Sequence, residues 1–297
     1  MKTTKAILIV CAGSMLATAL LFTACKKDSN SGSSNDTDAA NLSASSATAD
    51  NQYNDVLNTA LQTGVDGSTT STGYSSGLAY ASGKEITGGS SFTSCATITV
   101  SPADTTSYPK TVSIDFGTGC TDGNGVTRKG KITYVFSGRI LASGTTVSAT
   151  FDGYSVNGYQ LGGTYSITNN SSGNGISFMT SVSGGQITFP DATSYSFSGT
   201  RTVTQTAGVG TLSLLDDVYS ITGQHNFSSS AGKSLVDSVT TPLTWKLTCP
   251  HIVSGTLGFT YTYNGTSLDG TFDYGSGDCD ATATVKVGAV TKVVTLP

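Results

Sequence analysis

Hydrophobic and polar residues alternate with a period of two along most of the chain after residue 93. Ser, Thr and Gly occupy most of the intervening positions in runs such as Ile132–Phe136, Tyr159–Ile167 and Val253–Tyr263. This alternation is typical of antiparallel strands that bury one face and expose the other. We therefore expect residues 93–297 to form an all-β domain, a long antiparallel meander of about twelve strands.

Turn-forming residues divide this domain into hairpins, and glycines recur inside the expected strands. Asn157-Gly158 and Asn264-Gly265 are strong signals for tight hairpin turns. A glycine weakens a strand unless a bulge or a close neighbour requires the missing side chain. The glycines in question are Gly138, Gly163, Gly199, Gly223 and Gly255. We expect them to let the long strands coil, so that the sheet curls into a barrel-like form or a sandwich.

Residues 48–62 show a helical period instead. Tyr53, Val56, Leu57, Ala60 and Leu61 lie on one stripe of a helix. The opposite face lacks Lys and Arg, which favours packing on the sheet over binding to a membrane surface. We expect residues 47–92 to hold this short helix, followed by a Gly/Ser-rich loop.

The N-terminus has the three parts of an export signal. A basic start precedes the apolar run Ala6–Leu21, which is too short for a membrane-spanning helix, and the small residues Thr23 and Ala24 follow. Cys25 comes next, so this segment resembles the lipobox of bacterial lipoproteins. An ordinary signal peptide with a chance cysteine is the alternative. We predict a signal peptide over residues 1–24 and acylation of the Cys25 thiol.

Several acyl chains on one residue would hold the protein firmly to a membrane. Residues 25–46 are rich in Ser, Asn, Asp and Ala and have little apolar surface to bury. Such a composition is typical of disorder, so we expect this segment to be a lipidated, disordered tether.

Three further segments carry a resemblance to a known family. They are R-K-G-K-I-T-Y-V-F-S-G at residues 128–138, C-P-H-I-V-S-G-T-L at 249–257 and T-F-D-Y-G-S-G-D-C-D at 271–280. These segments resemble an uncharacterised family of Bacteroidota outer-membrane lipoproteins. The resemblance implies an exported all-β protein that is lipid-anchored in the outer membrane, and both the periplasmic and the exterior leaflet stay open. It implies no catalytic residue.

The cysteines favour disulfides. Of the six, Cys11 leaves with the signal and Cys25 takes lipid, and an even number remains in an exported chain. The segments I-D-F-G-T-G-C at 114–120 and F-D-Y-G-S-G-D-C at 272–279 are similar, and each has a second cysteine upstream. Similar units most simply close on themselves, which predicts the pairs Cys95–Cys120 and Cys249–Cys279. A zinc site is the weaker alternative, because no Cys-x-x-Cys pair occurs.

Charge and motifs point to no reaction. Only 11% of residues are charged and the formal net charge is −4, so the chain lacks the basic character of nucleic-acid-binding proteins. The G-Y-S-S-G segment at 73–77 matches a serine hydrolase motif but lacks the strand and helix that such a turn requires. His225 and His251 are the only histidines, and we expect both at strand positions.

Carboxylates give no stronger signal. Neither Asp216-Asp217 nor Asp269 with Asp273 has the fixed separation that a glycosidase requires. Asp122-Gly123-Asn124-Gly125 has some character of a calcium loop but is better interpreted as a tight turn. We therefore predict no catalytic residue, metal or cofactor.

The favoured function is a cell-envelope lipoprotein with a non-catalytic binding or structural β domain. A glycan or an envelope protein is the expected partner, with Tyr154, Tyr159, Tyr263 and Tyr274 as candidate sugar-stacking residues. A polysaccharide-directed hydrolase and a carrier of an apolar ligand are the alternatives. Thr105 and Ser238 follow aspartates, as the acceptors of Bacteroidota O-glycosylation do, and we predict modification of both.

Overall fold

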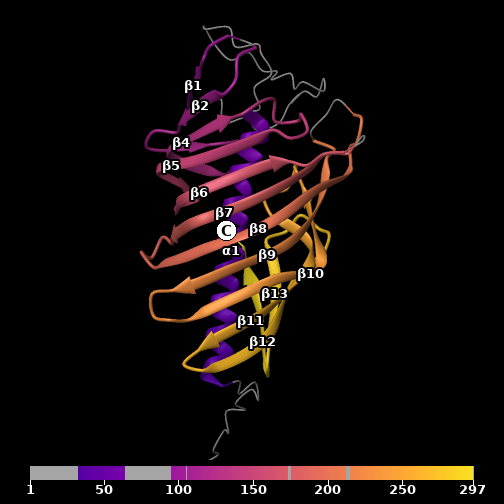
Figure 1. Ribbon diagram of the computed structural model, residues 1–297. Helices are drawn as coiled ribbons and strands as arrows, with labels where there is room; N and C mark the ends of the chain where they lie inside the picture. The colour runs from indigo at the N-terminus through magenta and orange to yellow at the C-terminus, as the bar shows by residue number, and fades with distance from the viewer. Residues whose placement is uncertain (1–32, 64–94, 105, 173–174, 212–214, 297) are drawn as a thin grey trace, which may run out of the picture. The chain divides into compact units, whose positions relative to one another are not determined.

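The computed structural model describes residues 33–63, 95–104, 106–172, 175–211 and 215–296 (Figure 1). These residues form one helix, α1 (Ser34–Thr63), and a single antiparallel sheet of fourteen strands. The predicted signal peptide, Cys25 and the Gly/Ser-rich loop at 64–92 lie outside the described residues. No helix within the described ranges combines the length and the apolar character that a membrane span requires.

The sheet is a meander, as predicted, with somewhat more strands than expected. Each strand pairs with its neighbours in the chain, except that β3 pairs only with β4 and β2 continues to β4. The strands are β1 (Thr97–Ser101), β2 (Lys110–Asp115), β3 (Cys120–Thr121), β4 (Thr127–Phe136), β5 (Thr146–Val156), β6 (Tyr159–Asn169), β7 (Ser177–Thr188), β8 (Ser194–Ala207), β9 (Val218–Ser229), β10 (Ser234–Lys246), β11 (Ile252–Tyr263), β12 (Thr266–Ser276), β13 (Thr282–Val287) and β14 (Val290–Thr295).

The sheet winds around α1 without closing. Figure 1 shows the strands crossing the helix, and α1 packs against β5, β6 and the strands from β10 to β14. The edge strands β1 and β14 do not pair with each other, so the fold is not a closed barrel. The described residues form a single sheet that encloses a helix, and not the two packed sheets of a sandwich. The hydrophobic core lies between the coiled sheet and the enclosed helix and consists of side chains from both.

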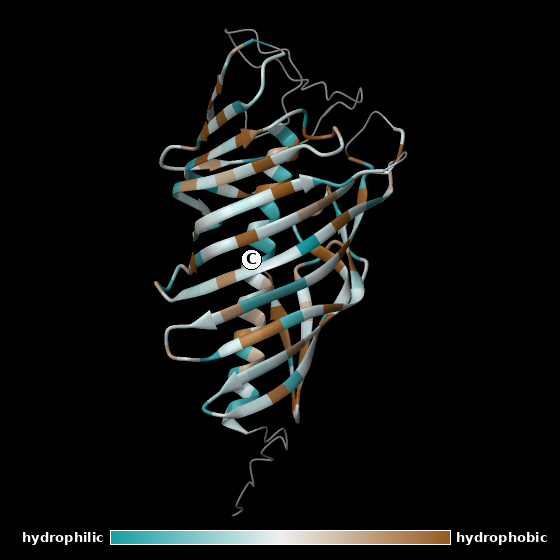
Figure 2. Ribbon diagram, viewed as in Figure 1, coloured by the Kyte–Doolittle hydropathy of each residue, from teal (hydrophilic) through white to brown (hydrophobic). Residues whose placement is uncertain are grey.

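The predicted alternation holds strand by strand. Figure 2 shows hydrophobic residues as separate bands along strands that are otherwise polar or neutral. One row of inward positions crosses neighbouring strands, with Tyr134 opposite Ala149, Ala149 opposite Tyr165 and Tyr165 opposite Val182. All four side chains are buried. The adjacent outward row runs through Ser148, Ser166, Ser181 and Thr200. Period two therefore separates a packed face from a hydroxyl-rich one.

The helix corrects two predictions. It begins at Ser34 instead of residue 48, so residues 34–46 are helical and not a disordered tether. Ser33 caps its start: the Asp36 amide donates to Ser33 Oγ at 3.2 Å, and the Ser33 amide donates to Asp36 Oδ2 at 3.0 Å. Composition was misleading because small residues such as Ala39, Ala40 and Ala47 are fully buried here. They need little apolar surface of their own, since the sheet supplies the large side chains.

The predicted helical stripe is confirmed, and glycines fit the sheet around it. All five stripe residues are buried. Tyr53 donates its hydroxyl hydrogen to one of two carbonyl oxygens, that of Gly162 at 2.8 Å or that of Gln186 at 3.1 Å.

The pairing register of β6 and β7 shifts between Gly162 and Thr164, where Gly163 has a φ of 86°. The expectation that glycines serve bulges therefore holds at Gly163, and also at Gly255. It fails at Gly138, which lies beyond the end of β4.

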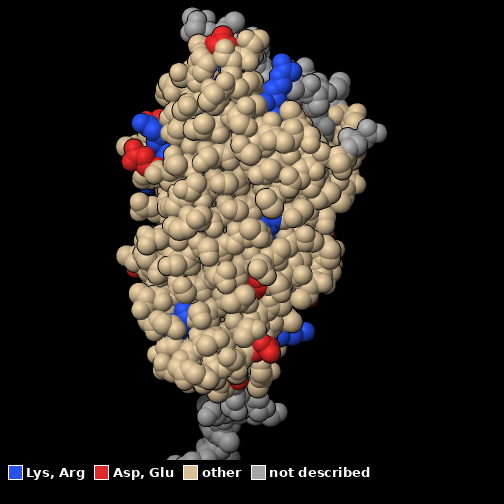
Figure 3. Space-filling model, viewed as in Figure 1, with Lys and Arg blue, Asp and Glu red and all other residues tan. Residues whose placement is uncertain are grey.

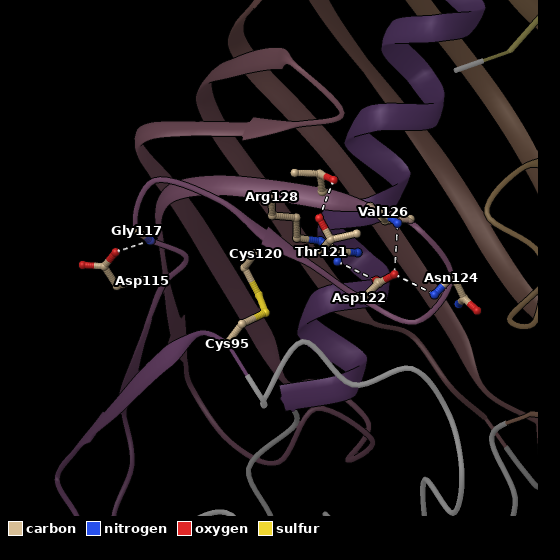
Figure 4. Close-up of a disulfide and its surroundings, with 10 residues drawn as sticks. Cys95, Asp115, Gly117, Cys120, Thr121, Asp122, Asn124, Val126 and Arg128 are labelled. Atoms are coloured by element: carbon tan, nitrogen blue, oxygen red, sulfur yellow. Dashed lines mark hydrogen bonds and ion pairs between the residues drawn. A yellow bond between two sulfur atoms is a disulfide. The ribbon is translucent and has the colours of Figure 1, made fainter.

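Both predicted disulfides are present. Cys95 bonds to Cys120 with Cα atoms 5.5 Å apart, and Cys249 bonds to Cys279 with Cα atoms 5.8 Å apart. The first joins the segment before β1 to β3 (Figure 4). The second links the β10–β11 connection to the β12–β13 connection.

Candidate binding sites along the central helix

A buried ionic cluster ties the middle of α1 to the sheet. Arg201 on β8 donates from Nη2 to Asp50 Oδ2 of the helix at 2.9 Å and to Asp237 Oδ1 of β10 at 3.2 Å. The same nitrogen lies 2.9 Å from Nδ1 of His225, whose Nδ1 is also 3.2 Å from Asp50 Oδ1. Ser46 donates to Asp237 Oδ2 at 2.9 Å. Three side chains, from α1, β9 and β10, therefore contact one guanidinium nitrogen of Arg201 on β8.

The surroundings shift the protonation of this cluster. Burial lowers the pKa of His225 to about 3, against the influence of Asp50, so its imidazole is neutral at physiological pH. Burial raises the pKa of Asp237 to about 6, although Arg201 favours its charged form. Burial also opposes ionisation of Asp50, but the positive charge of Arg201 and the hydrogen bond that it donates outweigh burial and lower the pKa of Asp50. Neither of the two hollows described below is lined by a residue of this cluster, and we interpret the cluster as an anchor of the helix.

A second buried arginine holds the C-terminal half of the helix. Arg128 on β4 donates from Nε to Asp55 Oδ2 at 2.8 Å and from Nη2 to Asp55 Oδ1, which is a bidentate pair. Its Nη1 donates to Asp122 Oδ2 at 2.8 Å. The nearby carboxylate Asp55 outweighs burial and raises the pKa of Arg128, so this guanidinium is permanently charged.

Asp122 belongs to a tight turn, as predicted. Its Oδ1 accepts hydrogen bonds from the amides of Asn124 and Val126, at 2.9 and 3.0 Å (Figure 4). Both carboxylate oxygens of Asp122 are thus engaged by the protein itself. Within the described ranges, no group of three or more His, Cys, Asp or Glu side chains is arranged to hold a metal ion.

Beside this turn lies a small hollow that we call the carboxamide pocket. Its volume is about 30 Å³. Six carboxamide side chains line it, four from α1 and two from turns of the sheet: Asn51, Gln52, Asn54, Asn58, Asn124 and Asn157. Asp55, Asp122 and Arg128 form its charged side, and Trp245 is part of an apolar wall. The pocket therefore lies where the β5–β6 turn and the end of β10 meet over the helix.

A larger hollow, the helix groove, lies at the N-terminal half of α1. Its volume is about 740 Å³, within the range of small-molecule sites. The helix lines it with Asp38, Asn41, Leu42 and Ser45, and the β7–β8 and β9–β10 hairpins line the other side with residues 192–196 and 229–231. Lys233 donates to Asp38 Oδ2 at 2.6 Å inside the groove, so the two charges compensate each other. Most of the remaining lining offers hydroxyls or amides.

A row of aromatic rings leads to the helix groove. Tyr159 contacts Phe189 with ring centroids 5.0 Å apart, Phe189 contacts Tyr195 at 5.1 Å, and Tyr195 contacts Phe227 at 4.6 Å. Tyr195 lines the groove and is half-buried. The row therefore holds the Tyr195 ring in place while leaving part of it accessible.

The structure separates the tyrosines proposed as a sugar platform. Tyr154 and Tyr274 are buried in the core, whereas Tyr159 and Tyr263 are half-buried. Tyr263 lies near the groove, because Lys233 is 5.4 Å from its ring centroid. The four do not form one surface, whereas Tyr195, which we did not single out from the sequence, lines the helix groove.

The other predicted residues lie apart. His225 is on β9, whereas His251 is in the connection before β11 and not on a strand. Asp217 is buried and accepts hydrogen bonds from Gln205 at 2.7 Å and from Tyr219 at 3.1 Å, while Asp216 is exposed. Asp269 and Asp273 are exposed on β12. Ser238 is exposed on β10, and its modification stays a prediction. Thr105, Cys25 and the segment 73–77 lie outside the described residues.

The arginine partners were also missed, although the sequence contained a signal. Arg201 shares the parity of Phe197 and Val203, and Arg128 shares that of Ile132 and Tyr134, so the alternation places both on the inward face. A charged residue at an inward position requires a buried partner. One partner of each arginine lies on α1, far away in the sequence, and the periodicity of the strands does not identify it.

None of the protein-family models, curated proteins or solved structures compared with the chain matches it.

Proposed function

We propose that this chain is a lipid-anchored cell-envelope protein whose β domain binds a neutral glycan in the helix groove, without catalysis. The lipobox-like segment before Cys25 supports the anchor. The two disulfides are compatible with export, since such bonds persist mainly in oxidising compartments. The helix groove is the single observation that carries the binding function.

The chemistry of the groove fits a sugar. Hydroxyl groups of Ser194, Ser196 and Ser230 and the amides of Asn41 and Gln186 can both donate and accept hydrogen bonds, as sugar hydroxyls do. The accessible part of the Tyr195 ring can pack on the C–H face of a pyranose. Because Asp38 and Lys233 pair with each other, the two charges in the groove cancel. The groove therefore favours neither an anionic nor a cationic ligand.

The surface beyond the groove agrees with a neutral partner. Figure 3 shows few and scattered charged side chains on the visible face of the molecule. A partner that meets this face would bind through hydrogen bonds and apolar contacts more than through ionic attraction.

The two alternatives have less support. A glycoside hydrolase requires two carboxyl groups across an accessible cleft. Asp50 and Asp237 are close together, but both bind Arg201 inside the core. A carrier of an apolar molecule requires a large apolar cavity, and α1 fills the interior of the coiled sheet with buried side chains.

Binding to a panel of immobilised neutral oligosaccharides tests the function. We expect the full acylated protein, in detergent micelles, to bind at least one neutral oligosaccharide. Tyr195→Ala should weaken that binding about tenfold, the scale of one lost ring contact. Tyr159→Ala is the matched control, since Tyr159 belongs to the same aromatic row but does not line the groove. Equal affinities of the two variants, or no binding at all, would contradict the proposal.

Mass spectrometry of the mature N-terminus tests the anchor separately. We expect an acylated Cys25 as the first residue and a membrane-bound product, and release into the medium after Cys25→Ser. An unmodified N-terminus in the native protein would remove the lipoprotein part of the proposal while leaving the groove untouched.

A further inference from the structure

The carboxamide pocket is a second, separate hollow whose chemistry points to a specific group. It lies beside residues 51–58 of α1, whereas the helix groove lies beside residues 38–45. With a volume of about 30 Å³ it has room for about two water molecules. That is enough for the end of one small substituent and too little for a sugar ring. A ligand would therefore insert a substituent and keep its body at the mouth, beside the exposed Asn124.

One residue that lines the pocket, Gln52, carries an unused hydrogen-bond donor. Gln52 is only 1% exposed, and its Nε2 has no hydrogen-bond partner among the described residues. Leaving a buried amide donor unpaired costs about 1–3 kcal/mol. A buried side chain of this kind is therefore a marker for a missing acceptor. The group that enters the pocket should bring a carbonyl or hydroxyl oxygen.

The charges of the pocket disfavour an ionic ligand. Arg128 is the only cation in the lining, and Asp55 and Asp122 already bind it. A carboxylate or phosphate would meet two engaged carboxylates, and a cation would have to compete with a bidentate arginine. The entering group should accordingly be neutral.

The remaining wall is apolar. Val126, Val156 and Trp245 line the pocket next to the carboxamides. A methyl group would contact this wall, while the carboxamides offer further donors and acceptors. A neutral group with a carbonyl oxygen, an N–H and a methyl has all three features, and on a sugar that group is an acetamido substituent.

We propose that the carboxamide pocket binds the acetamido group of an N-acetylhexosamine. The carbonyl oxygen accepts from Gln52 Nε2, the methyl packs on the wall that includes Trp245, and the sugar ring stays at the surface. This site is independent of the helix groove, so it neither requires nor replaces the function proposed for the groove.

The probe is N,N′-diacetylchitobiose, with cellobiose as the matched ligand that has the same linkage and lacks acetamido groups. The full acylated protein in detergent micelles is titrated calorimetrically, and saturation transfer to the acetyl methyl protons is recorded by NMR. We expect binding of diacetylchitobiose, strong transfer to the methyl protons and at least about tenfold weaker binding of cellobiose. Equal binding of the two disaccharides would overturn the proposal.

Variants locate the site. Gln52→Leu should weaken diacetylchitobiose binding about tenfold and abolish the preference over cellobiose. Gln160→Leu is the matched control, because Gln160 is an exposed glutamine of β6 outside both hollows, and it should leave binding unchanged. Thermal unfolding by circular dichroism verifies that Gln52→Leu folds. Asn124→Ala, an exposed pocket position, gives a second test and should also weaken binding.

Tyr195→Ala separates this proposal from the groove. If diacetylchitobiose binding is lost in Tyr195→Ala and retained in Gln52→Leu, the sugar occupies the groove, and the pocket proposal is wrong while the groove function stands. If Gln52→Leu alone loses binding, the pocket holds the acetamido group whatever the groove binds.

Discussion

Asp50 of the helix and Asp237 of β10 bind the same guanidinium nitrogen, Nη2 of Arg201, at 2.9 and 3.2 Å. One buried cation therefore holds together two carboxylates that are far apart in the sequence. Because the cluster is buried, breaking it is costly: either carboxylate would be left without a counter-charge in a medium of low dielectric.

Replacing Arg201 should destabilise the fold strongly. Arg201→Met keeps much of the side-chain volume but leaves Asp50 and Asp237 unpaired, and we expect the free energy of unfolding to fall by about 3–5 kcal/mol. Urea denaturation measures this change in the free energy of unfolding. Lys292→Met is the control, since Lys292 is exposed and bonds only to Asn41 Oδ1 among the described residues. The Lys292→Met substitution should lower the free energy of unfolding by less than about 0.5 kcal/mol. A loss below about 1 kcal/mol for Arg201→Met would show that the cluster is not an anchor.

The cluster also predicts an unusual dependence of stability on pH. The pKa of folded His225 is about 3, below its ordinary 6.5, so the unfolded state binds this proton first and stability falls as pH decreases from 6.5 towards 3. The pKa of folded Asp237 is about 6, above its ordinary 3.8, so stability falls as pH rises from 3.8 towards 6. The two contributions oppose each other between pH 4 and 6.

Asp237→Asn should expose the histidine contribution. The native protein should show little change in unfolding free energy from this cluster between pH 4 and 6, whereas the variant should lose up to about 1.4 kcal/mol for each unit of acidification. Asp50 stays charged through this window, because its pKa is lowered. Urea titrations at several pH values measure both curves. Parallel curves for the two proteins would contradict the assignment.

Two buried glutamines should respond in opposite ways to the same substitution. Gln205 donates to Asp217 Oδ1 at 2.7 Å, so Gln205→Leu should cost about 1–3 kcal/mol of unfolding free energy. Gln52 Nε2 lacks such a partner among the described residues, so Gln52→Leu should be neutral or stabilising in the absence of ligand. Both values come from denaturation of the ligand-free protein. A comparable loss of unfolding free energy in the two variants would mean that Gln52 Nε2 has a hydrogen-bond partner in the folded protein.

Adjacent glycines of the β6 bulge give a further matched pair. A Cβ on Gly163 would lie 2.6 Å from the Gly184 carbonyl oxygen, and its φ of 86° is unfavourable for other residues. Gly163→Ala should therefore cost about 2 kcal/mol or more. A Cβ on Gly162 would make only ordinary contacts at 3.7 Å, so Gly162→Ala should change stability by less than about 0.5 kcal/mol. Similar melting temperatures for the two variants would contradict the role of the bulge.

The sequence predicted the local features well, but it did not predict that the sheet winds around α1. Period two identified the strands, and similar segments around Cys120 and Cys279 identified the disulfides, because both signals lie within short stretches. The first part of α1 was missed, since Ala39, Ala40 and Ala47 give no apolar stripe and become buried only because a sheet surrounds them. Asp50 meets Arg201 across 151 positions of sequence, a relationship that only the tertiary structure defines.

The position of α1 also constrains the order in which the protein can be completed. The helix is synthesised before all fourteen strands, yet it packs against β13 and β14, which follow the other strands in the chain. Val285, Val294 and Leu296 near the C-terminus are buried in the same core. Contacts between the two ends of a chain form slowly because a long loop must close first. The helix would therefore stay incompletely covered until β13 and β14 had been synthesised, and these two strands would set the earliest moment at which the core can be completed.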